Sequence, residues 1–594
     1  MNRKKIDLQS FSLKPLAVAV VLAAAAATQA TAQSGASAGE SNLISGDYTR
    51  FGGYVRTWGS WNLENPGNEE RVAQRNGFGG FTPTETLTPT GRDEKGEMSM
   101  ARASLFLDWE NRRGEIVTKA TVRLDREHET SYMERLDNNR GRNSVIDLNN
   151  TLPGVVTSSD KLMEQYNNEQ IRDLYIDFPI NDRIQARLGK QQVVWGETDF
   201  FRALDQVTGF DYRWRSFLEV ENEELRKTNW MANFRINVPE KDGNLQILVR
   251  PGLDKGEDIG NSYDITGGRW ANAGYRTIDF YNRNNIGPAL AGAAAPIRRY
   301  LGTDLHHEKG DIDDWTGGIR WNGLAGNINY GIALFNGFGG NPVIAPAGVN
   351  FGNNYLGTTS GAGKNTKGSL GDVIYPKLTV AGFTLNGYSD TFDAVFSTEQ
   401  VYTKGVAYNF SVAGDPLGAG AQETSNVFNI LGLDGFKQKK TWSSMFRMDK
   451  TVNLQRVIGT SRPSFASVQV FNTHVLDFDR DEGLLSLIGM NSKLKENNSI
   501  ITFILAMNYK NDRINPTIAM GHDMTYGGSF FIPSVEFVYG DNWRLKAEAD
   551  IFFGAKSRPQ GFDLGQGNSQ DRGASLLGYF QNNDQFVLRL TRQF

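Results

Sequence analysis

The last ten residues, QFVLRLTRQF from Gln585 to Phe594, decide the fold. Phe586, Leu588 and Leu590 alternate with mostly polar residues along this stretch. Because successive side chains of a β-strand point to opposite faces, the pattern predicts a strand with one apolar and one polar face.

The stretch from Trp543 to Ile551 carries the same alternation with more charge. Every second side chain from Trp543 is apolar, and the side chains between them are those of Arg544, Lys546, Glu548 and Asp550. Four successive charges on one face exclude an ordinary sandwich core. They fit a wall between lipid and water, which is typical of a transmembrane antiparallel β-barrel.

The terminal Phe594 is a candidate membrane-assembly signal. A final aromatic residue with apolar residues at alternating positions before it resembles the signature that the barrel-assembly machinery recognises in outer-membrane barrels. Arg592 departs from that signature, because an aromatic residue is common there. The alternative is a soluble edge strand that ends in Phe, since alternation also occurs in soluble sheets.

The N-terminus predicts export. Residues 1–32 read as a signal peptide, with basic residues before an apolar run from Pro15 to Ala27 and a cleavage site at Ala30-Thr31-Ala32. Residues 33–50 are small and polar, and we expect a flexible arm. The chain has no cysteine, which excludes a lipid-modified cysteine, disulfides and thiolate metal sites. The expected location is the cell outer membrane.

Net charge and hydropathy limit the class of protein further. The net charge is −4 and no basic patch is interleaved with aromatic residues, so we expect no nucleic-acid partner. After the signal peptide no run of about 20 apolar residues occurs, which excludes a membrane-spanning helix there. The mean hydropathy of −0.44 does not exclude a barrel, because barrel strands expose only every second residue to lipid.

Residues 51–594 read as a single barrel of about 18 strands, with 16 to 20 as the range. Short turns alternate with long loops, as in barrels with periplasmic turns and extracellular loops. An even count returns the C-terminus to the side on which strand one starts. The expected strands are 51–62, 101–109 with 116–125, 170–179 with 183–192, 229–238 with 245–251, 314–322 with 327–336, 373–380 with 390–402, 439–449 with 464–475, 499–510 with 514–522, 530–539 with 543–553, and the final strand.

One long connection, residues 195–228, differs from the others because it is both charged and aromatic. We expect it to fold inward and narrow the pore; the alternative is an ordinary external loop. Its constriction candidates are Trp195, Glu197, Asp199, Asp205, Asp211, Arg213 and Arg215.

Several stretches resemble the proteobacterial outer-membrane barrel family known as domain of unknown function 1302. They are Leu188 to Glu197 (LGKQQVVWGE), Asp205, Glu223 to Arg226, and Asn582 to Gln585. The family usually has Pro where this chain has Thr208 to Asp211. The resemblance implies a large barrel that handles hydrophobic compounds, with a periplasmic lipoprotein and an inner-membrane exporter of the resistance-nodulation-division type as possible partners. It implies no catalytic residues.

Charged residues on the polar parity of the strands are candidates for lining the lumen. Their mixed charge is typical of a water-filled interior without strong ion selectivity. The alternative is that they form structural ion pairs beneath a plug and conduct nothing. The candidates are Lys119, Arg123, Asp125, Asp173, Asp177, Arg187, Arg235, Arg320, Arg447, Glu536, Arg544, Lys546, Glu548 and Asp550.

The chain offers little chemistry for catalysis. It has five histidines, and His474 is the one within an expected strand that could act as a base. Residues 477–483 begin like a calcium loop but lack glycine at the sixth position and an acid at the twelfth. We therefore expect no metal, no cofactor and no enzyme activity, and a membrane-embedded hydrolase is only the third reading.

The leading expectation is a passive outer-membrane channel for a hydrophobic or amphipathic small molecule. The second reading is a structural or envelope-assembly barrel that carries lipid. The expected partners are outer-membrane lipid and lipopolysaccharide, the barrel-assembly machinery, the small molecule and a possible periplasmic lipoprotein.

Overall fold

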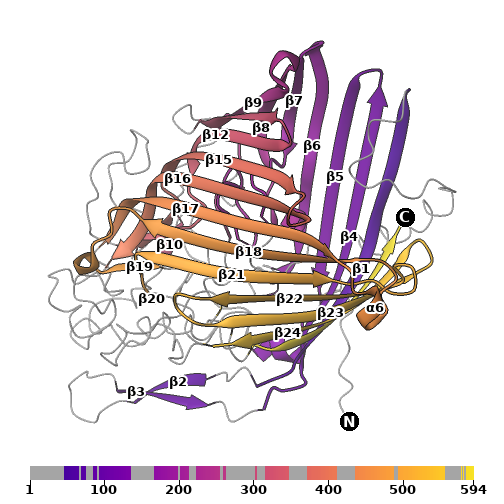
Figure 1. The fold of residues 1–594 in the computed structure, drawn as a ribbon. Helices are drawn as coiled ribbons and strands as arrows, with labels where there is room; N and C mark the ends of the chain where they lie inside the picture. Colours follow the sequence, from indigo (N-terminus) through magenta and orange to yellow (C-terminus); the bar gives the residue numbers. More distant parts are fainter. Residues whose placement is uncertain are drawn as a thin grey trace, which may run out of the picture.

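Eighteen antiparallel strands close into one barrel (Figure 1). The computed structural model describes residues 46–65, 69–74, 84–89, 93–135, 163, 166–198, 201–212, 222–254, 258–262, 301–303, 315–346, 371–410, 435–486, 492–554, 577, 580 and 583–594. The barrel strands are β1 (Tyr48–Asn62), β4 (Met98–Arg113), β5 (Ile116–Glu127), β6 (Asn168–Asn181), β7 (Ile184–Gln191), β8 (Asn229–Val238), β9 (Gly243–Arg250), β11 (Thr316–Ala325), β12 (Ile328–Phe338), β15 (Lys377–Ser389), β16 (Ala394–Phe410), β17 (Gly435–Val452), β18 (Ser464–Val475), β21 (Asn497–Ala506), β22 (Ile514–Asp523), β23 (Ser529–Tyr539), β24 (Trp543–Phe553) and β25 (Gln585–Gln593).

The last strand closes the ring against the first. β25 pairs with β1 from Tyr54 opposite Gln593 to Asn62 opposite Gln585, and the other side of β1 pairs with β4. Each remaining barrel strand pairs with its neighbours in chain order, so the wall contains no crossover. The expected closed barrel of about 18 strands is therefore confirmed.

The predicted bounds of one hairpin are wrong. The sequence predicted strands at 373–380 and 390–402, whereas β15 and β16 pair from Thr379 opposite Lys404 to Ser389 opposite Ala394. Residues Gly371–Ile374 form β14 in a separate small sheet. Asp393, with a φ of 49°, lies in the turn. The first strand also differs slightly, because β1 already pairs with β4 at Tyr48.

Short turns gather at one end of the barrel, and long connections at the other. Gly114 and Gly326 adopt positive φ in two of the tight turns, a conformation that glycine accepts without steric cost. The C-terminus lies at this turn end with the short helix α6 (Gln455–Ile458) (Figure 1).

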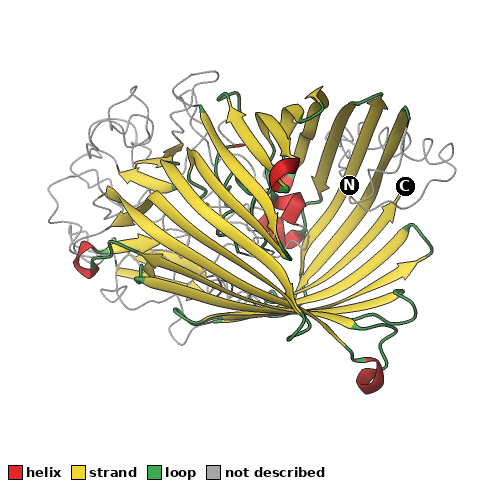
Figure 2. Cartoon of the chain, turned by 45° about the horizontal axis from the view of Figure 1, so that its top comes forward, coloured by secondary structure: helices red, strands yellow, loops and turns green. Residues whose placement is uncertain are grey.

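The loop end carries the smaller elements. They are the hairpin β2 (Glu69–Gln74) and β3 (Thr84–Pro89), the sheet of β10 (Leu301–Thr303), β13 (Val343–Pro346) and β14, the short strands β19 (Leu484–Ser486) and β20 (Ser492–Lys493), and the 3-10 turn η8 (Arg480–Glu482). The short helix α4 (Asn222–Leu225) instead lies inside the barrel, against β1 and β5. A second 3-10 turn, η3 (Pro239–Lys241), joins β8 to β9 at the turn end. Figure 2 shows short helical segments inside the ring of strands.

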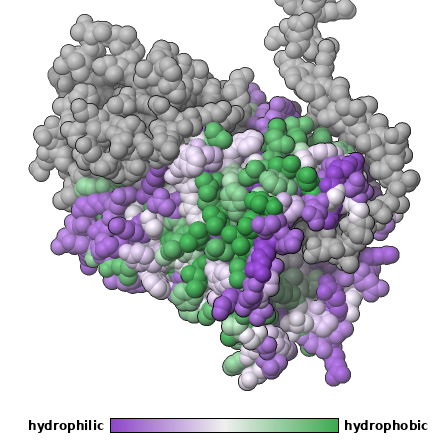
Figure 3. Space-filling view, turned by 90° about the horizontal axis from the view of Figure 1, so that it is seen from above, coloured by the Kyte–Doolittle hydropathy of each residue, from purple (hydrophilic) through white to green (hydrophobic). Residues whose placement is uncertain are grey.

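The outer face of the wall is apolar. On β12, Ile332 and Leu334 are 56% and 49% exposed, whereas Ala333 and Phe335, which alternate with them, are buried. Figure 3 shows apolar side chains gathered into a continuous area of the surface, with hydrophilic side chains to either side. This pattern suits a lipid-facing belt. Among the described residues, no helix is both long and apolar enough to cross a membrane.

Candidate functional site in the barrel lumen

The described parts of the connection from β7 to β8 lie in the lumen, and we call them the crossing segment. The described parts are 192–198, 201–212 and 222–228. They contact inward-facing side chains on separate arcs of the wall, from β1 to β16, so they form a bar in the interior.

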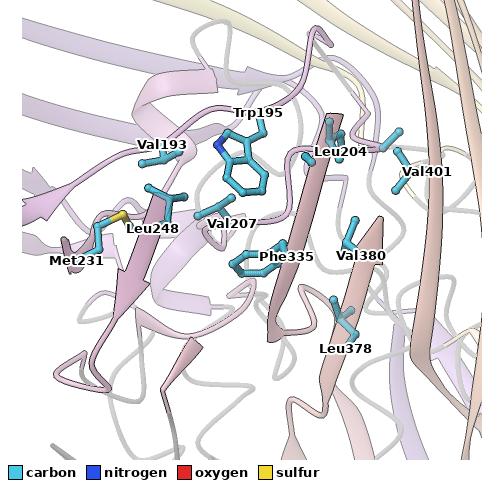
Figure 4. Close-up of a cluster of buried hydrophobic side chains, with 12 residues drawn as sticks. Val193, Trp195, Leu204, Val207, Met231, Leu248, Phe335, Leu378, Val380 and Val401 are labelled. Carbon is cyan, nitrogen blue, oxygen red and sulfur yellow. The ribbon is translucent and has the colours of Figure 1, made fainter. Parts of the chain in front are cut away.

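Trp195 anchors the crossing segment to the arc β8 to β16. Its indole is fully buried, lies edge-on to Phe335 with ring centroids 6.1 Å apart, and donates from Nε1 to Gln246 Oε1 at 2.9 Å. A Cβ on Gly318 of β11 would lie 2.6 Å from the Leu334 carbonyl oxygen and 2.7 Å from the indole, so glycine leaves room for both the neighbouring strand and the ring. Figure 4 shows the surrounding cluster of Val193, Ala203, Leu204, Val207, Met231, Leu248, Ala333, Leu378, Val380 and Val401.

Glu399 of β16 fixes the backbone of the same part of the crossing segment. Its carboxylate accepts hydrogen bonds from the backbone N–H of Glu197 and, at 2.9 Å, from the backbone N–H of Leu204. Glu399 is fully buried. No pattern in the sequence identifies this residue, because a single glutamate on the inward face of a strand carries no signal for a contact with a distant loop.

Two arginines of the wall also hold the crossing segment against this arc. Arg447 donates from Nη1 to the carbonyl oxygen of Glu197 at 2.9 Å and pairs through Nε with Asp449 at 2.8 Å. Arg320 Nη2 lies 4.0 Å from Glu197 Oε1. The structure thus brings two lumen candidates to one constriction candidate.

The middle of the bar is a short backbone ladder. The Asp211 N–H donates to the carbonyl oxygen of Leu225 at 2.8 Å, and the Lys227 N–H donates to that of Gly209 at 2.9 Å. Arg226 forms an ion pair with Asp205 at 2.5 Å, and both side chains are buried. The two ends of the crossing segment are therefore tied together inside the lumen.

Glu224 anchors the bar to another arc of the wall, at β1, β5 and β6. Arg56 Nη1 contacts both carboxylate oxygens at 2.7 and 2.9 Å, and the Tyr54 hydroxyl donates to Oε1 at 2.9 Å. Arg123 Nη2 lies 3.5 Å from Oε2. Arg172 donates from Nη1 to the Glu224 carbonyl oxygen at 3.0 Å.

A β-bulge brings Arg172 to this site. Val122 of β5 lies opposite Ile171, and Ala120 lies opposite Leu174, so β6 has one extra residue between these pairs. Ile171 and Leu174 both point outward and are exposed. The bulge therefore turns both Arg172 and Asp173 toward the lumen, whereas strict alternation predicts only Asp173 there.

A cavity of about 360 Å³ lies between the bar and the arc β16 to β18. Its volume is within the range typical of small-molecule sites. Apolar rings come from Phe201, Phe210, Tyr212, Phe338 and Tyr408, and the wall adds hydroxyl and amide groups from Thr403, Asn409, Thr441, Ser443 and Thr473. The site can therefore contact both an apolar body and a polar group.

The connection from β18 to β21 also reaches into the lumen and closes one side of this cavity. Leu485 lines the cavity and, in β19, pairs with Asn409 of β16. Glu482 forms ion pairs with Lys439 and, at 3.1 Å, with Lys437. Burial acts to raise the pKa of Glu482, but its hydrogen bonds to the two lysines dominate and lower it.

The other lumen candidates lie in ion pairs along the wall. The Asp177 carboxylate forms ion pairs with Arg187 and Arg235, at 2.7 and 2.6 Å. The further pairs are Lys119 with Asp108 at 3.4 Å, Arg123 with Asp125 at 3.0 Å, Arg544 with Glu536 at 3.4 Å, and Lys546 with Glu548 at 2.5 Å. Asp550 is fully buried opposite Gln585.

The remaining candidates lie elsewhere. Asp199, Arg213 and Arg215 fall outside the described residues. Phe594 lies at the turn end on the outer face, with its ring 6.3 Å from that of Phe51. His474 shares the outward parity of Trp442, and its Nδ1 lies 3.0 Å from Asn497 Oδ1, so the structure does not place it against a nucleophile of the lumen.

Comparison with known proteins identifies a family and several barrels of the same type. The family model described as "Protein of unknown function (DUF1302)" matches residues 13–594. No curated protein matches the chain.

Three of the solved structures similar to this chain are outer-membrane porins. Acinetobacter baumannii OccAB4 is 7% identical, covers 93% of this chain and 100% of its own, and has a TM-score of 0.41. OccAB1 of the same organism is 9% identical, with 93% and 99% covered and a TM-score of 0.39. The complex of Salmonella typhi OmpF with daunomycin is 8% identical, with 92% and 98% covered and a TM-score of 0.36. Similarity at this level says nothing about substrate.

Proposed function

The chain belongs to the DUF1302 family of outer-membrane-type barrels, and we propose that it is a passive channel for hydrophobic or amphipathic small molecules. The observation that carries this proposal is the cavity between the crossing segment and the arc β16 to β18. Its aromatic rings suit an apolar body, and its hydroxyl and amide groups suit a polar group on the same molecule.

The crossing segment makes the lumen narrow rather than open. Trp195 and Glu224 fasten it to two separate arcs of the wall. A molecule that passes through the lumen therefore contacts this bar or displaces it. Transport along such a path needs no energy source of its own.

Single-channel conductance of the purified barrel in a planar bilayer tests the proposal. The variants replace residues 195–226 with a Gly-Ser linker or carry Trp195→Ala, which removes about 3–5 kcal/mol of packing at one anchor. We expect conductance to rise in both variants. Replacement of Gln455–Ile458 at the turn end is the matched control, because α6 lies outside the lumen and has no buried residues.

A second candidate function rests on the buried ion pairs of β4 and β5. Arg102 and Glu127 form a fully buried pair at 2.8 Å, and Arg123 pairs with Asp125 beside it. A lumen filled in this way would suit a structural or lipid-carrying barrel. Silence of the wild type and of both lumen variants, with folding intact, would contradict the channel and favour this role.

Partnership with a periplasmic lipoprotein and an inner-membrane exporter is a further part of the proposal, and it comes from the family resemblance. The turn end, where the C-terminus lies, is the surface that such a partner would contact. Site-specific crosslinking from exposed turn residues such as Lys510 in whole cells should capture an exporter-linked lipoprotein. Crosslinking equal to that of a residue on the lipid-facing belt, Phe446, would contradict the partnership.

A further inference from the structure

We propose that the arginine site around Glu224 is a binding site for the carboxylate of an organic acid with an apolar body, and that Glu224 occupies it in the resting barrel. The inference rests on the channel function proposed above for access of the ligand to the lumen. It adds the chemical class of the ligand. It also adds a way in which ligand binding, by displacing Glu224, promotes opening of the lumen.

The first support is the geometry around the Glu224 carboxylate. Arg56, Arg123 and the Tyr54 hydroxyl converge on it from two strands, β1 and β5. Arginine and tyrosine donors arranged around one carboxylate are the groups that bind a carboxylate ligand. The carboxylate of Glu224 is thus an intramolecular example of the ligand that the site accepts.

The second support is the charge of the site. Arg56, Arg123 and Arg172 are each at most 4% exposed, and Asp125 balances one of these charges through its pair with Arg123. If Glu224 leaves, the cations exceed the acids that pair with them. Inside a wall with restricted access to water, that excess attracts an anion far more strongly than a surface charge would.

The third support is the apolar surface beside the arginines. The ring of Tyr54 stacks on Phe106 with centroids 5.0 Å apart, and Arg56 lies over the rings of Tyr54 and Trp58 at 4.3 and 5.3 Å. An inorganic anion has no apolar part that could pack against these rings. An acid with an aromatic or aliphatic body would pack against them while its carboxylate meets Arg56.

Displacement of the Glu224 carboxylate would remove the side-chain anchor of the bar at β1 and β5, while Arg172 still holds the backbone of residues 223–226. Leu225 and Arg226 follow Glu224 directly and form the ladder with residues 209–211 and the ion pair with Asp205. Asp205 and Phe210 also line the cavity. A ligand that replaces Glu224 therefore frees one anchor of the segment that forms one side of the proposed transport site.

Isothermal titration of the detergent-purified full-length barrel tests the site directly. The probe is 3-phenylpropanoate, and its uncharged counterpart 3-phenylpropanamide controls for partition into apolar surface. Glu224→Gln removes the competing carboxylate, which acts at an effective concentration on the order of millimolar. We expect Glu224→Gln to bind the acid at least about tenfold more tightly than the wild type, with no change for the amide.

Two further variants serve as controls for this test. Glu223→Gln makes the same change of charge one residue away, at an exposed side chain, and should leave the affinity of the wild type unchanged. Arg56→Gln in the Glu224→Gln background should abolish the gain. Retention of the folded form in gel electrophoresis without heating establishes that each variant is assembled.

The outcomes separate this inference from the channel function. Equal affinity of wild type and Glu224→Gln, or equal binding of acid and amide, would overturn the carboxylate site whatever the conductance. Tight, charge-dependent binding by a barrel that never conducts would overturn the channel and leave the site intact.

Discussion

Asp584, just before β25, is a buried acid at the loop end. Its Oδ1 accepts from the Phe552 N–H at 2.8 Å. Burial raises its pKa to about 6, repulsion from Glu64 adds to the shift, and the Phe552 N–H opposes it. Because the pKa of an unfolded aspartate is about 3.9, the folded barrel binds more protons between pH ~4 and ~6.

The sign of the pH effect follows from this difference. The contribution of Asp584 to stability is greatest below pH ~4 and is lost as the pH rises through about 6. Asp584→Asn keeps the acceptor for Phe552 and removes the ionisable group. We expect the variant to show a smaller fall of the unfolding midpoint in guanidinium between pH 5 and pH 7.5 than the wild type. An identical fall in both proteins would show that the charge of Asp584 has no effect.

At the scale of the element, the crossing segment depends on glycines in the wall. A Cβ on Gly382 of β15 would lie 2.7 Å from Leu204 Cδ1 of the crossing segment, whereas the nearest backbone atom of the wall is 3.3 Å away. Gly382 therefore makes room mainly for Leu204.

This contact predicts a specific change in conductance. Gly382→Val should push Leu204 from the wall and raise single-channel conductance, because overpacking of a close contact costs about 1–3 kcal/mol. Adding Leu204→Ala supplies the missing space, so the double variant should conduct less than Gly382→Val alone. Strict additivity of the two changes would rule out their contact as the cause.

The sequence revealed the strands better than the residues that hold the bar. Alternation predicts the wall because each strand repeats it with a period of two, and charges such as Lys546 and Glu548 follow that parity. Arg172 escapes the rule because the bulge in β6 shifts the parity by one residue.

The anchors of the bar escape prediction for a different reason. Glu399 and Leu204 are 195 positions apart, and no local pattern relates them. Trp195 stands out in the sequence as an aromatic residue in a charged stretch, but its partner Gln246 does not. Contacts between a loop and a distant wall depend on the closed ring, which the order of residues in either element does not encode.

At the scale of the whole molecule, Phe594 connects the end of the chain to its beginning. Its backbone N–H donates to the Gly53 carbonyl oxygen and its own carbonyl oxygen accepts from the Gly53 N–H, both at 3.1 Å. Its ring lies against Phe51 on the outer face. The residue predicted as the membrane-assembly signal is thus also the residue that completes the closure of the ring.

Substitution at this position should change yield more than structure. Phe594→Ala should lower the fraction of chains found folded in the outer membrane several-fold, whereas Phe594→Tyr should retain it, because tyrosine keeps the aromatic ring. The measurement is the heat-modifiable fraction in isolated outer membranes. Equal fractions for the alanine and tyrosine variants would contradict a role of the aromatic ring in assembly.

The seam between β1 and β25 has a consequence for the order of events in folding. Arg56 Nε donates to Thr591 Oγ1 at 3.2 Å, a contact between residues 535 positions apart. Contacts of such sequence separation form late, because the chain must bring its two ends together. Until β25 arrives, β1 has a free edge and the wall beside Arg56 is open. The crossing segment can therefore enter sideways while the ring is incomplete, and closure then traps it inside.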